Sequence, residues 1–249
     1  MDETDRPIRI TPDMLLSRRV DFERRMRRFP PFTMAIIVVL VAVFVGEVLF
    51  EALESAEAIV AAGALTREDV EAGQYWRLVT AVFLHGGLEH LVSNAIALFI
   101  LGMLAEHAFG RAQYFVLFVV SGLAGSLLSV LMNPGPSVGA SGAIFGLQAA
   151  AVVLFRRHRH RLLVRDRRIG VVMLVWALYS ILSGFTSPVI DNGAHIGGAI
   201  GGALVARRLH PVVLGPMPAE TAERVNRSWW LALGLVAYGV VGWLARLLR

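Results

Sequence analysis

Residues 112 to 155 read AQYFVLFVVSGLAGSLLSVLMNPGPSVGASGAIFGLQAAAVVLF and contain no charged side chain between Arg111 and Arg156. This stretch is long enough for two membrane crossings, since one helix needs about 20 apolar residues to span the hydrocarbon core. The run Asn133 to Pro136, Asn-Pro-Gly-Pro, cannot continue a helix and must turn the chain. We therefore expect a hairpin of two membrane-spanning helices here.

The composition of the whole chain extends this interpretation. Of 249 residues 56% are hydrophobic, and the mean hydropathy of +0.62 lies above that of soluble globular domains. We predict an all-α membrane protein, a helical bundle of six core transmembrane helices plus one C-terminal helix. The predicted spans are Phe32 to Phe50, Leu88 to Ala105, Ala112 to Met132, Ala140 to Phe155, Ile169 to Phe185, Ala194 to Leu209, and Trp229 to Leu247.

The arginines are distributed unevenly between the predicted loops. All 24 basic residues are arginine, and with a cytoplasmic N-terminus 20 of them lie in cytoplasmic segments. This bias predicts that the N-terminus is inside and the C-terminus outside. The net charge of +5 also suggests nucleic-acid binding as an alternative. However, the arginines fall between apolar spans, where they orient helices or contact anionic lipid. We therefore expect membrane lipid, and not nucleic acid, as a partner.

The predicted organisation has four parts. Residues 1–28 form a cytoplasmic arm, 29–210 the membrane domain, 211–227 a cytoplasmic linker and 228–249 an additional C-terminal helix. The arm is too long and too mixed in charge for the basic region of a signal peptide, so we expect the first span to be retained. Without compartment-targeting features, the chain is expected in a bacterial cytoplasmic membrane. The oligomeric state stays open.

Two polar residues begin apolar spans. Ser141 is flanked by Gly139 and Gly142, which free space for the serine to face a cavity and leave its N–H at a helix N-terminus. The same glycines also allow close helix packing. His195 is an ionisable residue within a span and needs a polar partner or water. A hydrogen bond from Ser141 to His195 is the minimum needed for acyl transfer.

Neighbouring residues on the two helices support this pairing. Phe145, one turn after Ser141, is positioned to stack on the imidazole of His195. Gly198 and Gly202 lie on the face of His195 and favour a close approach of the helix that begins near Ser141. Asp191 precedes His195 by four residues and is a third triad member or an N-cap, of which the cap is favoured.

A third helix contributes polar residues at the same depth. His90 and Asn94 are four residues apart on one face, and both side chains can donate to an oxyanion, although such residues also serve as interhelical glue. The sequence has no H-E-x-x-H pattern, so metal ligation is not favoured. The lack of cysteine excludes a thiolate nucleophile and thiolate metal ligands. We expect no cofactor and no metal.

Taken together, these motifs resemble those of the rhomboid family of intramembrane serine proteases, over roughly residues 30 to 210. The family's Gly-x-Ser-Gly is present as Gly139 to Gly142, its Ala-His-x-x-Gly as Ala194 to Gly198, and its His-x-x-x-Asn as His90 to Asn94. Further matches to the family pattern are His85, the first-loop pair Trp76 and Arg77, and the aromatic Phe145.

The resemblance implies a Ser141–His195 dyad without a required acid, and an oxyanion site of the Ser141 N–H, His90 and Asn94. It also implies hydrolysis of transmembrane protein substrates near the outer end of their helices, favouring small residues at the cut. In the family the fifth span, here Ile169 to Phe185, is the proposed lateral gate, and the loop from Gly184 to Asp191 would cap the site. The last span looks like the extra helix of the six-plus-one subgroup.

Two alternatives come from other classes. The first is a non-catalytic rhomboid-like protein that binds transmembrane clients, which the presence of both Ser141 and His195 argues against. The second is a transporter whose helix N-termini bind an anion, which the lack of recognisable repeats argues against.

Overall fold

The computed structural model describes residues 19–26, 29–187 and 190–247. These residues form helices and two isolated β-bridges, Val20–Leu162 and Leu65–Ser137. The helices are α2 (Phe22–Arg25), α3 (Pro31–Leu49), α4 (Ala56–Ala62), α5 (Arg67–Glu71), α6 (Arg77–Thr80), α7 (Leu88–Met132), α8 (Ser141–Arg157), α9 (Arg167–Gly184), α10 (Asn192–Ala206), the short 3-10 helix η2 (Val212–Leu214) and α11 (Ala219–Leu247).

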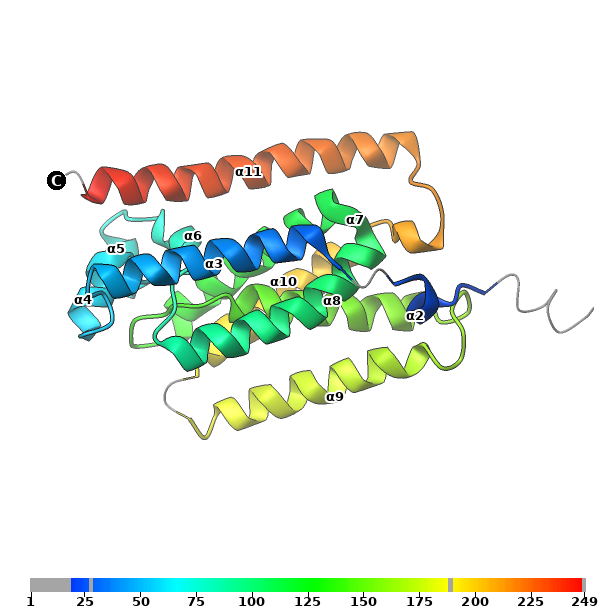
Figure 1. Cartoon of the computed structure of the whole chain (residues 1–249), viewed down its shortest axis with the longest axis horizontal. Coiled ribbons are helices and arrows are strands. Elements are labelled where there is room, and N and C mark those ends of the chain that lie inside the picture. The colour runs from blue at the N-terminus through cyan, green and yellow to red at the C-terminus, as the bar shows by residue number, and fades with distance from the viewer. Residues whose placement is uncertain (1–18, 27–28, 188–189, 248–249) are drawn as a thin grey trace, which may run out of the picture.

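The long helices lie side by side along the long axis of the molecule (Figure 1). The short helices α4, α5 and α6 and the C-terminal end of α11 gather at one end, which we call the loop end, and α2 lies at the other. Four helices, α3, α7, α9 and α11, are long and apolar enough to cross a membrane. This arrangement confirms the predicted all-α membrane bundle.

The helix α7 contains two predicted spans, because its backbone reverses at Gly110, whose φ of 74° and ψ of 163° are not helical. A Cβ placed on Gly102 would lie 2.8 Å from the Tyr114 hydroxyl oxygen. Twelve residues of straight helix would separate these positions by about 18 Å. The segments before and after Gly110 therefore pack against each other as two antiparallel helices.

A carboxylate that the sequence analysis did not single out joins α3 to the first segment of α7. Glu106 is buried and accepts hydrogen bonds from the backbone N–H groups of Phe32 (3.2 Å) and Thr33 (2.9 Å) and from the Thr33 hydroxyl (3.0 Å). The first N–H groups of a helix have no partner within it. Glu106 thus caps α3, which begins at Pro31, a residue suited to the first turn.

The helices α8 and α10 occupy the centre of the bundle. They have 17 and 15 residues, so at about 1.5 Å per residue both are shorter than the roughly 30 Å hydrocarbon core. The buried face of α10 is mostly glycine, and a Cβ would lie 2.4 Å from the Ala124 carbonyl oxygen at Gly197 and 2.3 Å from the Gly146 carbonyl oxygen at Gly202. These small residues let α10 fit between α7 and α8.

The helices α9 and α11 are peripheral. The buried residues of α9 are Gly170, Met173 and Gly184, so most of its side chains face outward. The last helix, α11, begins at Ala219, well before the apolar run predicted from Trp229. The residues between are good helix formers and include an i,i+4 ion pair from Arg227 to Glu223 (3.5 Å), so the helix extends into the predicted linker.

Candidate active site

Ser141 begins α8 at the loop end of the bundle, after a tightly held turn. The N–H of Gly139 donates to the carbonyl oxygen of Ala81 (2.8 Å), and Gly139 has a φ of +116°, which favours glycine. A Cβ at this position would lie 2.6 Å from Cε1 of His90. The turn therefore brings the imidazole of His90 against the backbone two residues before the serine.

His195 lies in the first turn of α10, which Asp191 caps. One carboxylate oxygen of Asp191 accepts the N–H of Ala194 (2.9 Å), and the other accepts the hydroxyls of Ser129 (2.5 Å) and Ser137 (2.6 Å). The predicted N-cap is confirmed. Among the described residues Nδ1 of His195 is buried without a hydrogen-bond partner, so Asp191 does not bind the imidazole as a triad acid would.

Close backbone contacts bring the start of α8 against the start of α10. A Cβ at Gly142 would lie 3.1 Å from the Ala194 carbonyl oxygen, and a Cβ at Gly198 would lie 1.9 Å from the Gly142 carbonyl oxygen. The predicted approach of the two helices at Gly198 is therefore present. The ring of Phe145 stacks on that of His195 at 4.1 Å between centroids and 17° between planes, as the sequence predicted.

At the pair Ser141 and His195 the structure differs from the sequence prediction. Over its described residues it contains no hydrogen bond between Ser141 and His195, although both lie at the same end of adjacent helices. The imidazole is instead held by its stack on Phe145.

His90 and Asn94 lie in the first turns of α7. Asn94 is buried, and its side-chain N–H donates to the carbonyl oxygen of His90 (2.9 Å). The His90 ring contacts that of His85 edge to face, with 5.2 Å between centroids. One Asn94 donor is thus engaged within its own helix, while His90 lies between Gly139 and His85. Within the described residues, no three histidine, aspartate or glutamate side chains are grouped to hold a metal ion.

His85 is supported by a residue that the sequence analysis missed. Glu47, buried near the end of α3, accepts the backbone N–H of His85 through both carboxylate oxygens (2.9 and 3.2 Å). A lone acid within a predicted span was the available signal, because such residues are costly in a membrane unless they have a partner. Glu47 thereby joins the first span to the segment that leads into α7.

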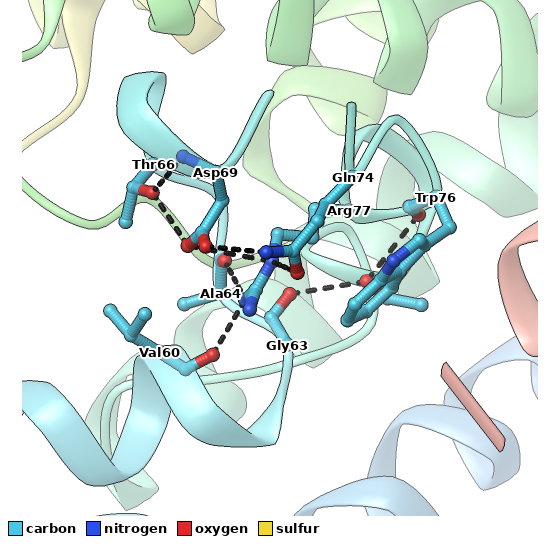
Figure 2. Close-up of polar contacts among 9 residues, drawn as sticks. Val60, Gly63, Ala64, Thr66, Asp69, Gln74, Trp76 and Arg77 are labelled. Atoms are coloured by element: carbon cyan, nitrogen blue, oxygen red, sulfur yellow. Dashed lines mark hydrogen bonds and ion pairs between the residues drawn. The ribbon is translucent and has the colours of Figure 1, made fainter. Parts of the chain in front are cut away.

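The pair Trp76 and Arg77 belongs to a compact network at the loop end (Figure 2). Arg77 is 2% exposed, and its guanidinium donates to the carbonyl oxygens of Val60 (2.5 Å) and Ala64 (2.7 Å). It also donates to the Gln74 side chain (3.0 Å) and lies 4.7 Å from the Trp76 ring centroid. Arg77 therefore ties together the loop between α3 and α7.

A small cavity opens beside the start of α8. Its lining combines small and apolar residues with two serines, and includes Ala81, Val82, Ser126, Ser137, Gly139, Gly142 and Ala194.

Comparison with known proteins gives a consistent result. Residues 72–212 match the family model described as the rhomboid domain. The chain is 34% identical over 211 residues to "Rhomboid protease GluP" of Bacillus subtilis, covering 85% of this chain and 41% of that protein. It is 30% identical over 201 residues to "Rhomboid protease AarA" of Providencia stuartii, covering 70% of each.

A plant relative, "RHOMBOID-like protein 5" of Arabidopsis thaliana, is 40% identical over 143 residues, covering 56% of this chain and 46% of that protein. The chain thus spans less than half the length of GluP and of this plant protein. The matched region contains every residue of the candidate site described above except Glu47, Val60 and Ala64, which precede residue 72.

Proposed function

The chain belongs to the rhomboid family, and we propose that it is a serine endopeptidase that cleaves transmembrane helices of membrane proteins with a Ser141–His195 dyad. The observation that carries this proposal is the stack of His195 on Phe145, one helical turn from Ser141, at the contact between Gly142 and Gly198. The nucleophile and the base begin adjacent helices. The hydrogen bond that acyl transfer needs between them would form when substrate enters, because catalytic hydrogen bonds often tighten only in the reacting complex.

In the proposed reaction the hydroxyl oxygen of Ser141 attacks the carbonyl carbon of the scissile peptide, and His195 takes the hydroxyl proton. His195 then returns this proton to the leaving amide nitrogen, which departs and leaves an ester on Ser141. Water, deprotonated by His195, then attacks the ester carbonyl carbon; the bond to the Ser141 oxygen breaks, His195 returns the proton to this oxygen, and the acid product leaves. The capping contacts of Asp191 support a dyad, because its carboxylate is already engaged by Ser129, Ser137 and the N–H of Ala194.

We assign the oxyanion donors to the N–H of Ser141 at the start of α8 and to the side chains of His90 and Asn94. Helix N-termini carry free N–H groups and a positive dipole end, which favour a developing negative charge. The contact of His90 with Gly139 supports this assignment. Asn94 must release its bond to the His90 carbonyl oxygen, or use its second N–H, to take part.

Substrate access is proposed to occur beside α9. A helical substrate hides its carbonyl groups in its own hydrogen bonds, so it must unwind locally before Ser141 can reach one. The shallow burial of α9 supports its role as a gate, because few contacts oppose its displacement. The loop Gly184 to Asp191 is the proposed cap, and Pro188 and Val189 of this loop lie outside the described residues.

We also propose that the loop end faces the outside of a bacterial cytoplasmic membrane. The stretch 156–168 at the opposite end contains seven arginines, whereas the loop from Glu51 to Tyr75 is rich in acids. Basic residues concentrate on the cytoplasmic side. Ser141 and His195 then lie toward the outer leaflet, and cleavage occurs near the outer end of the substrate helix.

The proposal is tested by cleavage of a helical transmembrane substrate in proteoliposomes, with labelling of the serine by a fluorophosphonate. Wild type should cleave and label, whereas Ser141→Ala and His195→Ala should insert normally and cleave nothing. Because residues that act as a unit are not additive, the double variant should be no worse than either single one. Wild-type turnover in Ser141→Ala would refute the mechanism.

A further inference from the structure

The loop-end half of α11 packs directly against α6 and the loop before it, although α11 carries no catalytic motif (Figure 1). A Cβ at Gly242 would lie 2.5 Å from both Cβ and Cγ of Trp76, and a Cβ at Gly239 would lie 2.7 Å from Cβ of Val79. Real Cβ atoms essentially never approach below 3.0 Å. The helix and the loop are therefore in contact with no space for a larger residue.

A polar contact fixes α11 at the same place. The indole N–H of Trp243 donates to the carbonyl oxygen of Ala62 (2.8 Å), and Cδ1 of its ring lies 3.4 Å from where a Cβ of Gly63 would be. Ala62 and Gly63 lie between Val60 and Ala64, whose carbonyl oxygens the Arg77 guanidinium binds. Figure 2 shows Val60, Gly63 and Ala64 beside Arg77. Trp243 of α11 therefore binds the same stretch of the loop as the Arg77 guanidinium.

The same loop also holds the turn before the serine. Leu65 and Ser137 exchange two backbone hydrogen bonds (3.0 and 2.8 Å). Ala81, which follows α6, accepts the N–H of Gly139 (2.8 Å). These bonds attach the loop at two points to the four residues that precede Ser141. A displacement of the loop is thus transmitted to the backbone that carries the nucleophile.

We propose that α11 is a positioning element of the active site, and that Gly239, Gly242 and Trp243 are its positioning residues. They hold the loop in the place from which it orients the Gly139 turn and the N–H of Ser141. This inference rests on the proposed function, and adds that the additional helix sets the rate of the chemical step. Since misplacement of reacting groups by about 1 Å costs around a hundredfold in rate, kcat responds more than KM.

The experiment compares Gly242→Leu with Gly234→Leu on the same helix. Gly234 has nothing within 4 Å of its Cβ position, so its variant controls for a leucine on α11. The full chain is measured in proteoliposomes for kcat and KM on a helical transmembrane substrate. Amide hydrogen exchange over residues 60–82 and 137–141 reports the position of the loop without activity.

We expect Gly242→Leu to lower kcat at least about tenfold, with KM within about twofold of wild type and faster exchange in both stretches. Gly234→Leu should match wild type. If Gly242→Leu does not fold, Trp243→Phe is the deciding variant, because it removes the indole N–H that binds the Ala62 carbonyl oxygen and keeps a smaller aromatic ring. We expect it to lower kcat about threefold or more with faster exchange.

Wild-type kcat and wild-type exchange in a folded Gly242→Leu, or in Trp243→Phe when that variant decides, would overturn the proposal. Equal losses in Gly234→Leu and Gly242→Leu would also overturn it, because the effect would then come from leucine on α11 and not from the loop contact. A wild type that cleaves nothing would refute the proposed function, whereas the exchange comparison would still decide whether α11 holds the loop and the turn.

Discussion

Gly198→Ala is the sharpest test of how the helices that carry Ser141 and His195 are spaced. The Cβ of the new residue would lie 1.9 Å from the Gly142 carbonyl oxygen, and real Cβ atoms keep at least about 3.0 Å. The backbones of α8 and α10 must therefore separate locally by about 1 Å, a misplacement that costs around a hundredfold in rate. The helix itself is not weakened, because alanine is favoured over glycine by about 1 kcal/mol within a helix.

The assay is turnover of a helical transmembrane substrate per correctly inserted molecule, together with the rate of fluorophosphonate labelling at Ser141. Both should fall by roughly a hundredfold in Gly198→Ala, and overpacking should also lower stability by about 1 to 3 kcal/mol. Gly46→Ala is the matched control, since Gly46 lies in a long helix with nothing within 4 Å of its Cβ position. Unchanged turnover in a folded Gly198→Ala would refute the argument that this contact sets the distance between Ser141 and His195.

Three further predictions follow from the site and from the charge distribution. Asn94→Ala should lower turnover at least tenfold with nearly unchanged thermal stability. The reason is that an oxyanion donor contributes about 2.7 to 4 kcal/mol in the transition state, whereas an interhelical hydrogen bond averages about 0.6 kcal/mol. Early melting with normal turnover would show that Asn94 has a structural role. Asp191→Asn should lower the free energy of unfolding by about 1 to 3 kcal/mol and keep near-normal turnover per folded molecule, since it weakens bonds to two serine hydroxyls and not to His195. Loss of turnover without loss of stability would instead identify Asp191 as a triad acid. In this cysteine-free chain, a cysteine at Glu57 should react with an impermeant thiol reagent from outside and one at Arg161 only after permeabilisation, and the reverse pattern would invert the proposed orientation.

Contacts that depend on local periodicity were predictable. The stack of Phe145 on His195 follows from a four-residue spacing on one helix once the two helices are neighbours, and the Asp191 cap follows from its place just before an apolar run. The interruption between the second and third spans was visible as Arg111 between two apolar runs. The reversal of the backbone at Gly110 could be located only from the φ and ψ angles of the structure.

Contacts between segments far apart in the chain were not predictable in this way. Glu47 and Glu106 lie within or beside apolar runs. The residues that flank them in the sequence do not indicate that the N–H groups of His85 and Thr33 are their partners. The Ser141–His195 hydrogen bond was expected from chemistry and is not made in the structure. Side-chain rotamers depend on packing, and packing around His195 is decided by the stack with Phe145.

By itself, the sequence determined the class of the molecule. A bilayer admits helices whose backbone groups are satisfied internally, so long apolar runs, their turns and the arginine bias already specify a helical membrane bundle and its expected sidedness. The glycines that flank Ser141 and follow His195 also marked where two helices approach. Only the tertiary structure decided what surrounds this pair, because pairing between distant segments depends on their three-dimensional packing and leaves no periodic signal. The contact of α11 with Trp76 through Gly242, and the attachment of that loop to Gly139, are of this kind.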